Sequence, residues 1–286
     1  MRKFNKVTLI VSACLVAVGA LISFAGYIKG GSPLYNIDIT KKFGHWYQQS
    51  DDKMVDSYEL LSDNSDIKGI NLNMLYGDVS ITADSTARCV SVSTTIPQKH
   101  IKAEINSSGM LEVKDMRSKP QINGLHFDFG TGEYAEVNVV VPRDMLDTLS
   151  VNLDCGDIKI NNLSAGKGSI ILDCGDFTVK SCTIGSGRII NSCGDIKIAE
   201  SSIGLAKITD TLGDISFDSS KILSDLGIKS SCGDVNIENP VNKCVYNVHD
   251  SLGSINLGKY KNDNSNSDAS IPVVTSDLSC GDFKVY

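Results

Sequence analysis

The stretch Leu153-Asp154-Cys155-Gly156-Asp157-Ile158-Lys159-Ile160 decides the fold, because its central Gly-Asp pair recurs along the second half of the chain. From Cys155 onward the copies follow at steps of 19 or 20 residues, and the last step is 28. A fixed period of about 20 residues indicates a protein built from stacked repeats. The copies, with one early outlier at Tyr76, are Tyr76-Gly77-Asp78, Cys155-Gly156-Asp157, Cys174-Gly175-Asp176, Cys193-Gly194-Asp195, Leu212-Gly213-Asp214, Cys232-Gly233-Asp234, Leu252-Gly253-Ser254 and Cys280-Gly281-Asp282.

Apolar and polar residues alternate on either side of each Gly-Asp pair. In the copy at Cys155 the apolar residues are Val151, Ile158 and Ile160, and the polar Lys159 lies between the last two. Alternation with a period of two is typical of a β-strand that buries one face. One repeat cannot bury its apolar residues alone, so the repeats must stack, about 4.8 Å apart. The sequence therefore predicts an all-β, single-stranded parallel β-helix (β-solenoid) with rungs of about 20 residues.

The recurring glycine and aspartate fit a sharp corner between two strands. Such a corner often needs a positive φ, which glycine adopts at little cost, and an aspartate there can bond backbone N–H groups. We therefore predict a structural corner ladder, and no catalytic, cofactor-binding or metal site. Its members are Gly77, Asp78, Gly156, Asp157, Gly175, Asp176, Gly194, Asp195, Gly213, Asp214, Gly233, Asp234, Gly253, Gly281 and Asp282.

Two other interpretations of the corner aspartates are weaker. Gly-Asp repeats of shorter period bind calcium in some parallel β-rolls, and Asp154 and Asp173 add carboxylates to two adjacent corners. Paired carboxylates could also hydrolyse a polysaccharide. However, Ser254 interrupts the series, and a residue repeated on every rung is typical of a structural role.

One position holds either Cys or Leu, which favours a small or medium apolar side chain. We therefore predict a buried column rather than cross-links. A disulfide between adjacent rungs remains compatible with a spacing of about 4.8 Å. A soft-metal thiolate site is less favoured, because no histidine or fourth ligand is evident. The column comprises Cys155, Cys174, Cys193, Leu212, Cys232, Leu252 and Cys280.

The first 28 residues differ from the rest, since Arg2, Lys3 and Lys6 precede an uncharged run over 7–28. As a helix this run would be about 33 Å long, enough to span a bilayer. A cleaved signal peptide is the alternative. We predict a cytoplasmic stub and transmembrane helix over 1–28, with the remainder extracellular. Residues 29–66 would be a juxtamembrane linker and candidate N-terminal cap. The solenoid would occupy 67–286, with an insertion at about 97–142.

The charge balance bears on partners. The chain has 27 Lys+Arg against 34 Asp+Glu, a formal net charge of -7, so we expect no nucleic-acid partner. The chain ends at Phe283-Lys284-Val285-Tyr286, within a predicted strand. An uncapped last rung could pair with another chain. We therefore predict an open edge there, available for self-association or for a partner.

At its Gly-Asp repeats the chain resembles a bacterial "putative adhesin" family, also described as LiaG-like, over about residues 67–286. The resemblance rests on the corner motif, the spacing near 20, and the early copy at Gly77-Asp78 before a longer insertion. It implies a β-solenoid on the outer face of a Gram-positive membrane. The chain departs from it at Gly253-Ser254 and in its cysteine-rich column.

The function expected from this resemblance is a membrane-anchored, non-catalytic binding or scaffold module of the cell envelope. Its partner would be the cell wall, a surface or another protein. Two alternatives remain: a regulatory or sensory component of an envelope-stress system, and a polysaccharide-cleaving β-helix enzyme.

Overall fold

The computed structural model describes residues 37–38, 55–63, 66–117, 126–127, 135–142, 145–260 and 271–286. The chain divides into two compact units, one of residues 1–51 with 119–133, and one of residues 52–118 with 134–286. In the first unit the described residues form an antiparallel pair, β1 (Ile37–Asp38) with β8 (His126–Phe127). The second unit holds every other described strand.

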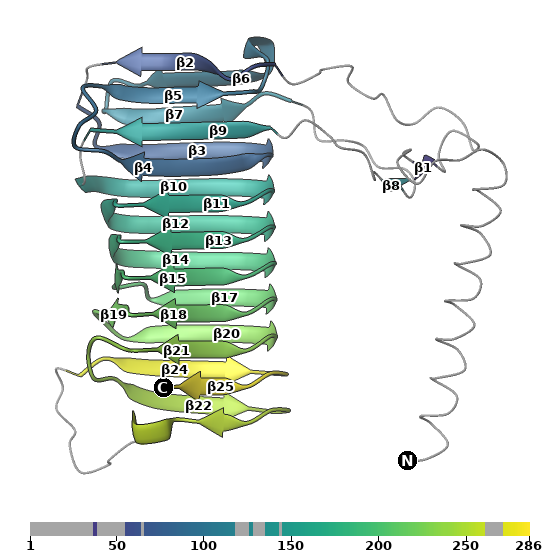
Figure 1. The fold of residues 1–286 in the computed structure, drawn as a ribbon, viewed down its shortest axis with the longest axis vertical. Helices are drawn as coiled ribbons and strands as arrows, with labels where there is room; N and C mark the ends of the chain where they lie inside the picture. Colours follow the sequence, from purple (N-terminus) through teal and green to yellow (C-terminus); the bar gives the residue numbers. More distant parts are fainter. Residues whose placement is uncertain are drawn as a thin grey trace. The chain divides into compact units, whose positions relative to one another are not determined.

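The second unit is a stack of rungs (Figure 1), most of them made of a long strand, a Gly-Asp corner and a short strand. Neighbouring long strands pair in parallel, and so do neighbouring short strands. In spatial order the long strands are β3 (Gly69–Tyr76), β10 (Met145–Cys155), β12 (Ser164–Cys174), β14 (Thr183–Cys193), β17 (Lys207–Leu212), β20 (Leu226–Cys232), β24 (Val273–Leu278) and β22 (Val245–Asp250). The short strands are β4 (Asp78–Ala83), β11 (Ile158–Asn161), β13 (Phe177–Lys180), β15 (Ile196–Ala199), β18 (Ile215–Asp218), β21 (Val235–Glu238), β25 (Phe283–Val285) and β23 (Ile255–Asn256). The prediction of an all-β fold built mainly from parallel strands is confirmed.

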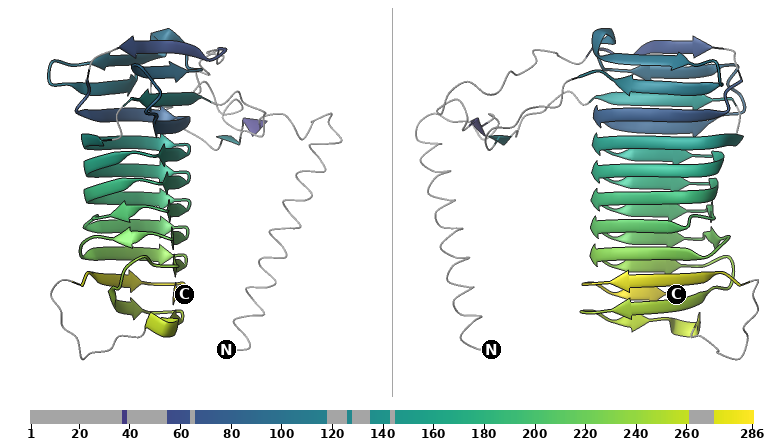
Figure 2. Two further views of the ribbon diagram at one scale, coloured as in Figure 1. Left: turned by 60° about the vertical axis from the view of Figure 1, so that its left-hand side comes forward. Right: turned by 180° about the vertical axis from the view of Figure 1, so that it is seen from behind.

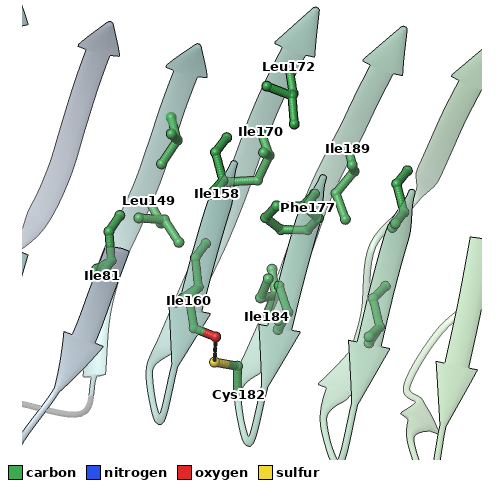
Figure 3. Packing of buried hydrophobic residues seen from close by; sticks show 14 of the residues in the cluster. Ile81, Leu149, Ile158, Ile160, Ile170, Leu172, Phe177, Cys182, Ile184 and Ile189 are labelled. Carbon is green, nitrogen blue, oxygen red and sulfur yellow. Dashed lines mark hydrogen bonds between the residues drawn. The ribbon is translucent and has the colours of Figure 1, made fainter. Parts of the chain in front are cut away.

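The core lies between the two sheets, where alternate residues of each strand meet (Figure 3). Ile158, Ile160 and Phe177 are at most 1% exposed, whereas Lys159 between the first two is exposed. A buried thiol also belongs to this core, since Cys182 Sγ lies 3.5 Å from the Ile160 carbonyl oxygen. The alternation read from the sequence therefore places the apolar side chains correctly.

A second corner, formed without glycine, closes five of the rungs. Its residues have left-handed backbone angles, a conformation that non-glycine residues seldom adopt. No single residue type marks this corner in the sequence, because asparagine, serine and glutamate share the position. They are Asn162, Ser181, Glu200, Ser219 and Asn239, with φ between 48° and 56°. Two short strands, β16 (Ser202–Ile203) and β19 (Lys221–Ile222), pair in parallel beyond it.

The segment predicted as an insertion at 97–142 contributes strands to the stack. Beyond β3 and β4 the next rung comes from two of these strands, β7 (Met110–Asp115) and β9 (Glu136–Val141), both parallel to their neighbours. Antiparallel strands then cover this end: β6 (Ile101–Ile105) pairs with β7, β5 (Val90–Thr94) pairs with β9, and β2 (Tyr58–Asp63) pairs with β5. A short 3-10 turn, η2 (Gln98–His100), precedes β6.

At the other end of the stack, the C-terminal strands do not form the predicted open edge. β24 lies between β20 and β22, and β25 lies between β21 and β23, so the last rung in sequence is next to last in space. Figure 2 shows the yellow C-terminal strands enclosed in this way. The terminal rung is β22 and β23, followed by the 3-10 turn η3 (Gly258–Tyr260). Whether the chain self-associates stays a prediction.

The predicted transmembrane segment at 1–28 lies outside the described residues, as does most of the predicted linker at 29–66. Within the described part of the chain, no helix has the length and apolar character needed to cross a membrane.

Candidate functional site

The first corner of each rung is built from a glycine that no other residue could replace without strain. Gly156 and Gly175 have φ of 133° and 136°, a region open essentially to glycine alone. A Cβ on Gly175 would lie only 2.0 Å from the Gly156 carbonyl oxygen of the neighbouring rung. The corner therefore needs glycine both for its backbone angle and for the close stacking of rungs.

The corner aspartates form a continuous ladder of hydrogen bonds between rungs. Each carboxylate accepts a bond from the backbone N–H of the aspartate on the next rung: Oδ1 of Asp157 lies 3.0 Å from the Asp176 nitrogen. The other links join Asp78 to Asp157, Asp176 to Asp195, Asp195 to Asp214, Asp214 to Asp234, Asp234 to Asp282 and Asp282 to Ser254, at 2.7–3.0 Å.

The spatial order of the rungs explains the serine that interrupts the repeat. Ser254 belongs to the terminal rung, where its N–H donates to Asp282. No described rung lies beyond it, so a carboxylate at this position would have no N–H group to accept from. The one missing aspartate thus marks the end of the ladder.

The predicted buried column is wrong, because its side chains lie on the surface. Cys155, Cys174, Cys193, Cys232 and Cys280 are exposed, and Leu212 and Leu252 are 51% and 73% exposed. The prediction rested on the presence of Cys or Leu at this position, and Cys155 is also in phase with the buried Val151 and Leu153 of its strand. The strand ends at this position, however, and the chain bends around the glycine. The side chain before the glycine consequently points outward at the vertex of the corner.

The exposed column is held in register by the sheet. The Cα partners of β10 and β12 include Cys155 with Cys174, and the Gly175 N–H donates to the Cys193 carbonyl at 2.8 Å. Partial burial raises the pKa of the Cys155 thiol, and the neighbouring Cys174 thiol and the carboxylates of Asp154 and Asp173 raise it further. The thiols therefore line an acidic edge of the molecule.

A short polar column crosses the apolar core two residues before the thiol column. Three copies have leucine there, at Leu153, Leu172 and Leu278, but Asn191, Asp210 and Ser230 take its place on three successive rungs. Burial raises the pKa of Asp210 to about 7, and Asp195 and Asp214 contribute to the increase. Hydrogen bonds from the Thr211 backbone and the Asn191 side chain oppose part of this increase. The sequence signal for this column is the change from leucine to a polar residue at the same position of the repeat.

On the rung next to Cys155, beyond the end of the thiol column, a tyrosine takes the place of the thiol and lies against a buried ion pair. Tyr76 occupies the cysteine position of its rung, and the Arg117 guanidinium lies 3.5 Å from its ring centroid. Arg117 Nε donates to Asp115 Oδ1 at 2.9 Å, and Asp115 Oδ2 accepts the Leu75 N–H at 3.1 Å. These contacts join the ends of β3 and β7.

A pair of basic residues stands out on the outer face of the long-strand sheet. Arg188 and Lys207 are exposed and directly opposite each other in β14 and β17. Neither makes an ion pair within the described chain. Lys229, on the next rung, lies on the same face, two residues beyond Gly227, which is the Cα partner of Lys207. The sequence did not reveal this basic face, because its members are about 20 residues apart and come together through stacking.

The described residues offer little support for catalysis. An open depression of about 640 Å³ is lined by Thr82, Ala83, Asp84, Ser85, Pro142 and Asn162. It contains one carboxylate, Asp84, whose pKa is lowered by hydrogen bonds from Thr86. Glycoside hydrolysis needs two carboxyl groups in unlike environments, and the corner carboxylates share one environment. Within the described chain, no three His, Cys, Asp or Glu side chains converge as metal ligands would.

Comparisons with known proteins concern the second unit. The family model for Toastrack DUF4097 matches residues 67–275. No curated protein matches the chain. Several crystal structures resemble it at low identity. A "putative cell adhesion protein" from Clostridium sporogenes is 13% identical, covers 80% of this chain and 98% of its own, and has a TM-score of 0.38. Two "putative adhesin" structures, from Parabacteroides distasonis and Bacteroides fragilis, are 12% and 11% identical. They cover 82% and 81% of this chain and 98% and 97% of theirs, with TM-scores of 0.38 and 0.36.

Proposed function

The chain belongs to the Toastrack DUF4097 family, and from that premise we propose that it is a non-catalytic binding and scaffold module of the bacterial cell envelope. In this proposal the N-terminal segment over 7–28 anchors it in the membrane and the stack of rungs lies outside the cell. The observation that carries the proposal is the corner ladder. Every corner carboxylate from Asp78 to Asp282 accepts a backbone hydrogen bond, so the repeated acidic groups serve the frame.

Because the corner residues have a structural role, we look for the binding surface on the two outer faces of the sheets. The basic pair Arg188 and Lys207 favours the outer face of the long-strand sheet. Two cations placed directly opposite in a sheet repel each other. An anionic partner would relieve that repulsion, whereas the rest of this acidic chain would repel such a partner. The partner we propose is therefore an anionic polymer of the cell wall.

The test uses the full chain, purified in detergent micelles, and measures its retention on cell-wall fractions with and without their anionic polymers. We expect retention that weakens with added salt and falls at least tenfold in the double variant Arg188→Glu, Lys207→Glu. The matched control carries Lys159→Glu and Lys197→Glu, an equal charge change on exposed positions of the short-strand sheet.

Equal losses in the two double variants would show that only net charge matters and would remove the binding face from the proposal. Absence of retention on every fraction, with an envelope-stress phenotype when the gene is deleted, would replace the binding role with a regulatory one.

A further inference from the structure

The exposed thiol column has a regular geometry that the binding role does not use. Cys155, Cys174 and Cys193 occupy three consecutive rungs, and Cys232 and Cys280 occupy two more after Leu212. The spacing is fixed next to each thiol by backbone bonds. The Gly156 and Gly175 N–H groups donate to the carbonyls of Cys174 and Cys193 at 2.9 and 2.8 Å.

The spacing of the rungs suits a metal ion better than a disulfide. Strands in a sheet lie about 4.8 Å apart, and so do stacked Cβ atoms in register. A disulfide needs Cβ atoms about 3.8 Å apart, so its formation would pull two rungs together against their hydrogen bonds. A metal–thiolate bond is about 2.3 Å long. Two such bonds in line span about 4.6 Å, close to the distance between rungs.

The chemistry of the column selects the class of ion. Thiolates prefer soft cations such as Cu(I). The described residues hold no cluster of three converging ligands, so the column supplies two sulfur atoms to each ion, one from each side. The carboxylates of Asp154 and Asp173 lie beside the first two thiols and favour positive charge there.

We propose that the thiol column binds soft monovalent cations, one between each pair of thiols on adjacent rungs. The three consecutive thiols would then hold two ions and share the middle sulfur, and the pair Cys232–Cys280 would hold a third. The reaction at the first group is 3 RSH + 2 M⁺ → [(RS)₃M₂]⁻ + 3 H⁺. No electron is transferred, and three protons pass to the solvent. Uptake therefore strengthens as the pH rises.

The test is an anaerobic titration of the reduced full chain with cuprous ion, in competition with a coloured Cu(I) chelator. The middle thiol should matter twice as much as its neighbours. We expect Cys174→Ser to lose two ions, and Cys155→Ser and Cys193→Ser to lose one each. Cys89→Ser removes a thiol outside the column and should lose none.

A gain-of-function variant makes the test independent of lost folding. Leu212 interrupts the column and is itself exposed. Leu212→Cys would join the two groups of thiols and should add two ions. Circular dichroism verifies that each variant keeps the β structure of the parent chain.

Two results would overturn the proposal. The first is an equal Cu(I) capacity in Cys174→Ser and Cys89→Ser. The second is a Cys155–Cys174 disulfide, found by mass spectrometry after exposure to a small-molecule disulfide, that forms as readily as in an unstructured dithiol peptide. That result would show that the rungs adapt freely to the shorter spacing.

Discussion

Asp210 is a buried acid at a position where three other rungs carry leucine. It is 1% exposed, and Asn191 lies opposite it on the neighbouring strand. Burial raises the pKa of Asp210 to about 7 from an ordinary 3.8. Because the folded-state pKa is the higher one, the folded chain holds this proton at pH values where the unfolded chain has lost it. The stabilising contribution is therefore complete below about pH 4 and disappears as the pH rises through about 7.

The first prediction follows from this shift. Asp210→Asn removes the ionisable group and keeps the shape, so the variant should gain free energy of unfolding relative to the parent as the pH rises from 4 to 8. The full difference is about 4 kcal/mol at most, from about three pKa units. Urea denaturation at pH 4, 6 and 8 measures it, and Asp277→Asn, on an exposed position of β24, is the control. A difference between variant and parent that does not change with pH would contradict the prediction.

The corner is the element that links neighbouring rungs outside the sheets. Its glycine lets one rung approach the carbonyl of the next, and its aspartate binds the next backbone N–H. A charged acceptor strengthens such a bond. The ladder therefore holds the stack together where the strands end and the regular pairing of the sheet stops.

The second prediction concerns this ladder. Asp195→Ala removes the acceptor of the Asp214 N–H, bound at 2.9 Å, and should lower the free energy of unfolding by about 1 kcal/mol. Ser254→Asp completes the repeat in sequence but should give no stability, because no rung beyond it supplies an N–H group. Urea denaturation measures both variants. A clear gain from Ser254→Asp would show that the ladder continues past the terminal rung.

At the scale of the whole molecule, the order of the final rungs decides which residues are buried. The rung formed by β24 and β25 carries Val274, Leu278, Phe283 and Val285, each at most 3% exposed, whereas Ile255 in the terminal rung is 47% exposed. Placing the more apolar rung inside removes more apolar surface from water. Tyr246 of the terminal rung packs on Phe283, with ring centroids 6.1 Å apart.

The third prediction tests this order. Phe283→Ala should lower the free energy of unfolding by about 3–5 kcal/mol, as expected for a large buried aromatic side chain. Ile255→Ala should lower it by less than about 1 kcal/mol, since half of that side chain already meets water. A chain whose last residues formed a frayed edge would lose little in both variants. Denaturation curves of the two variants, measured side by side, decide the matter.

The sequence alone determined the repeat, the parallel β architecture and the apolar columns. These features depend on local alternation and on a spacing that returns along the chain, as at Val151, Ile158 and Ile160. The role of Gly156 and Asp157 in a corner also followed from the conformations open to glycine and the bonds open to aspartate.

The tertiary structure alone decided three other features. The outward direction of Cys155 depends on the bend at the corner, which breaks the alternation of the strand. The place of β24 between β20 and β22 depends on competition between two rungs for the same neighbour. The meeting of Arg188 with Lys207 depends on register. In each case the physical cause is a contact between segments far apart in sequence. A local sequence pattern contains no information about such contacts.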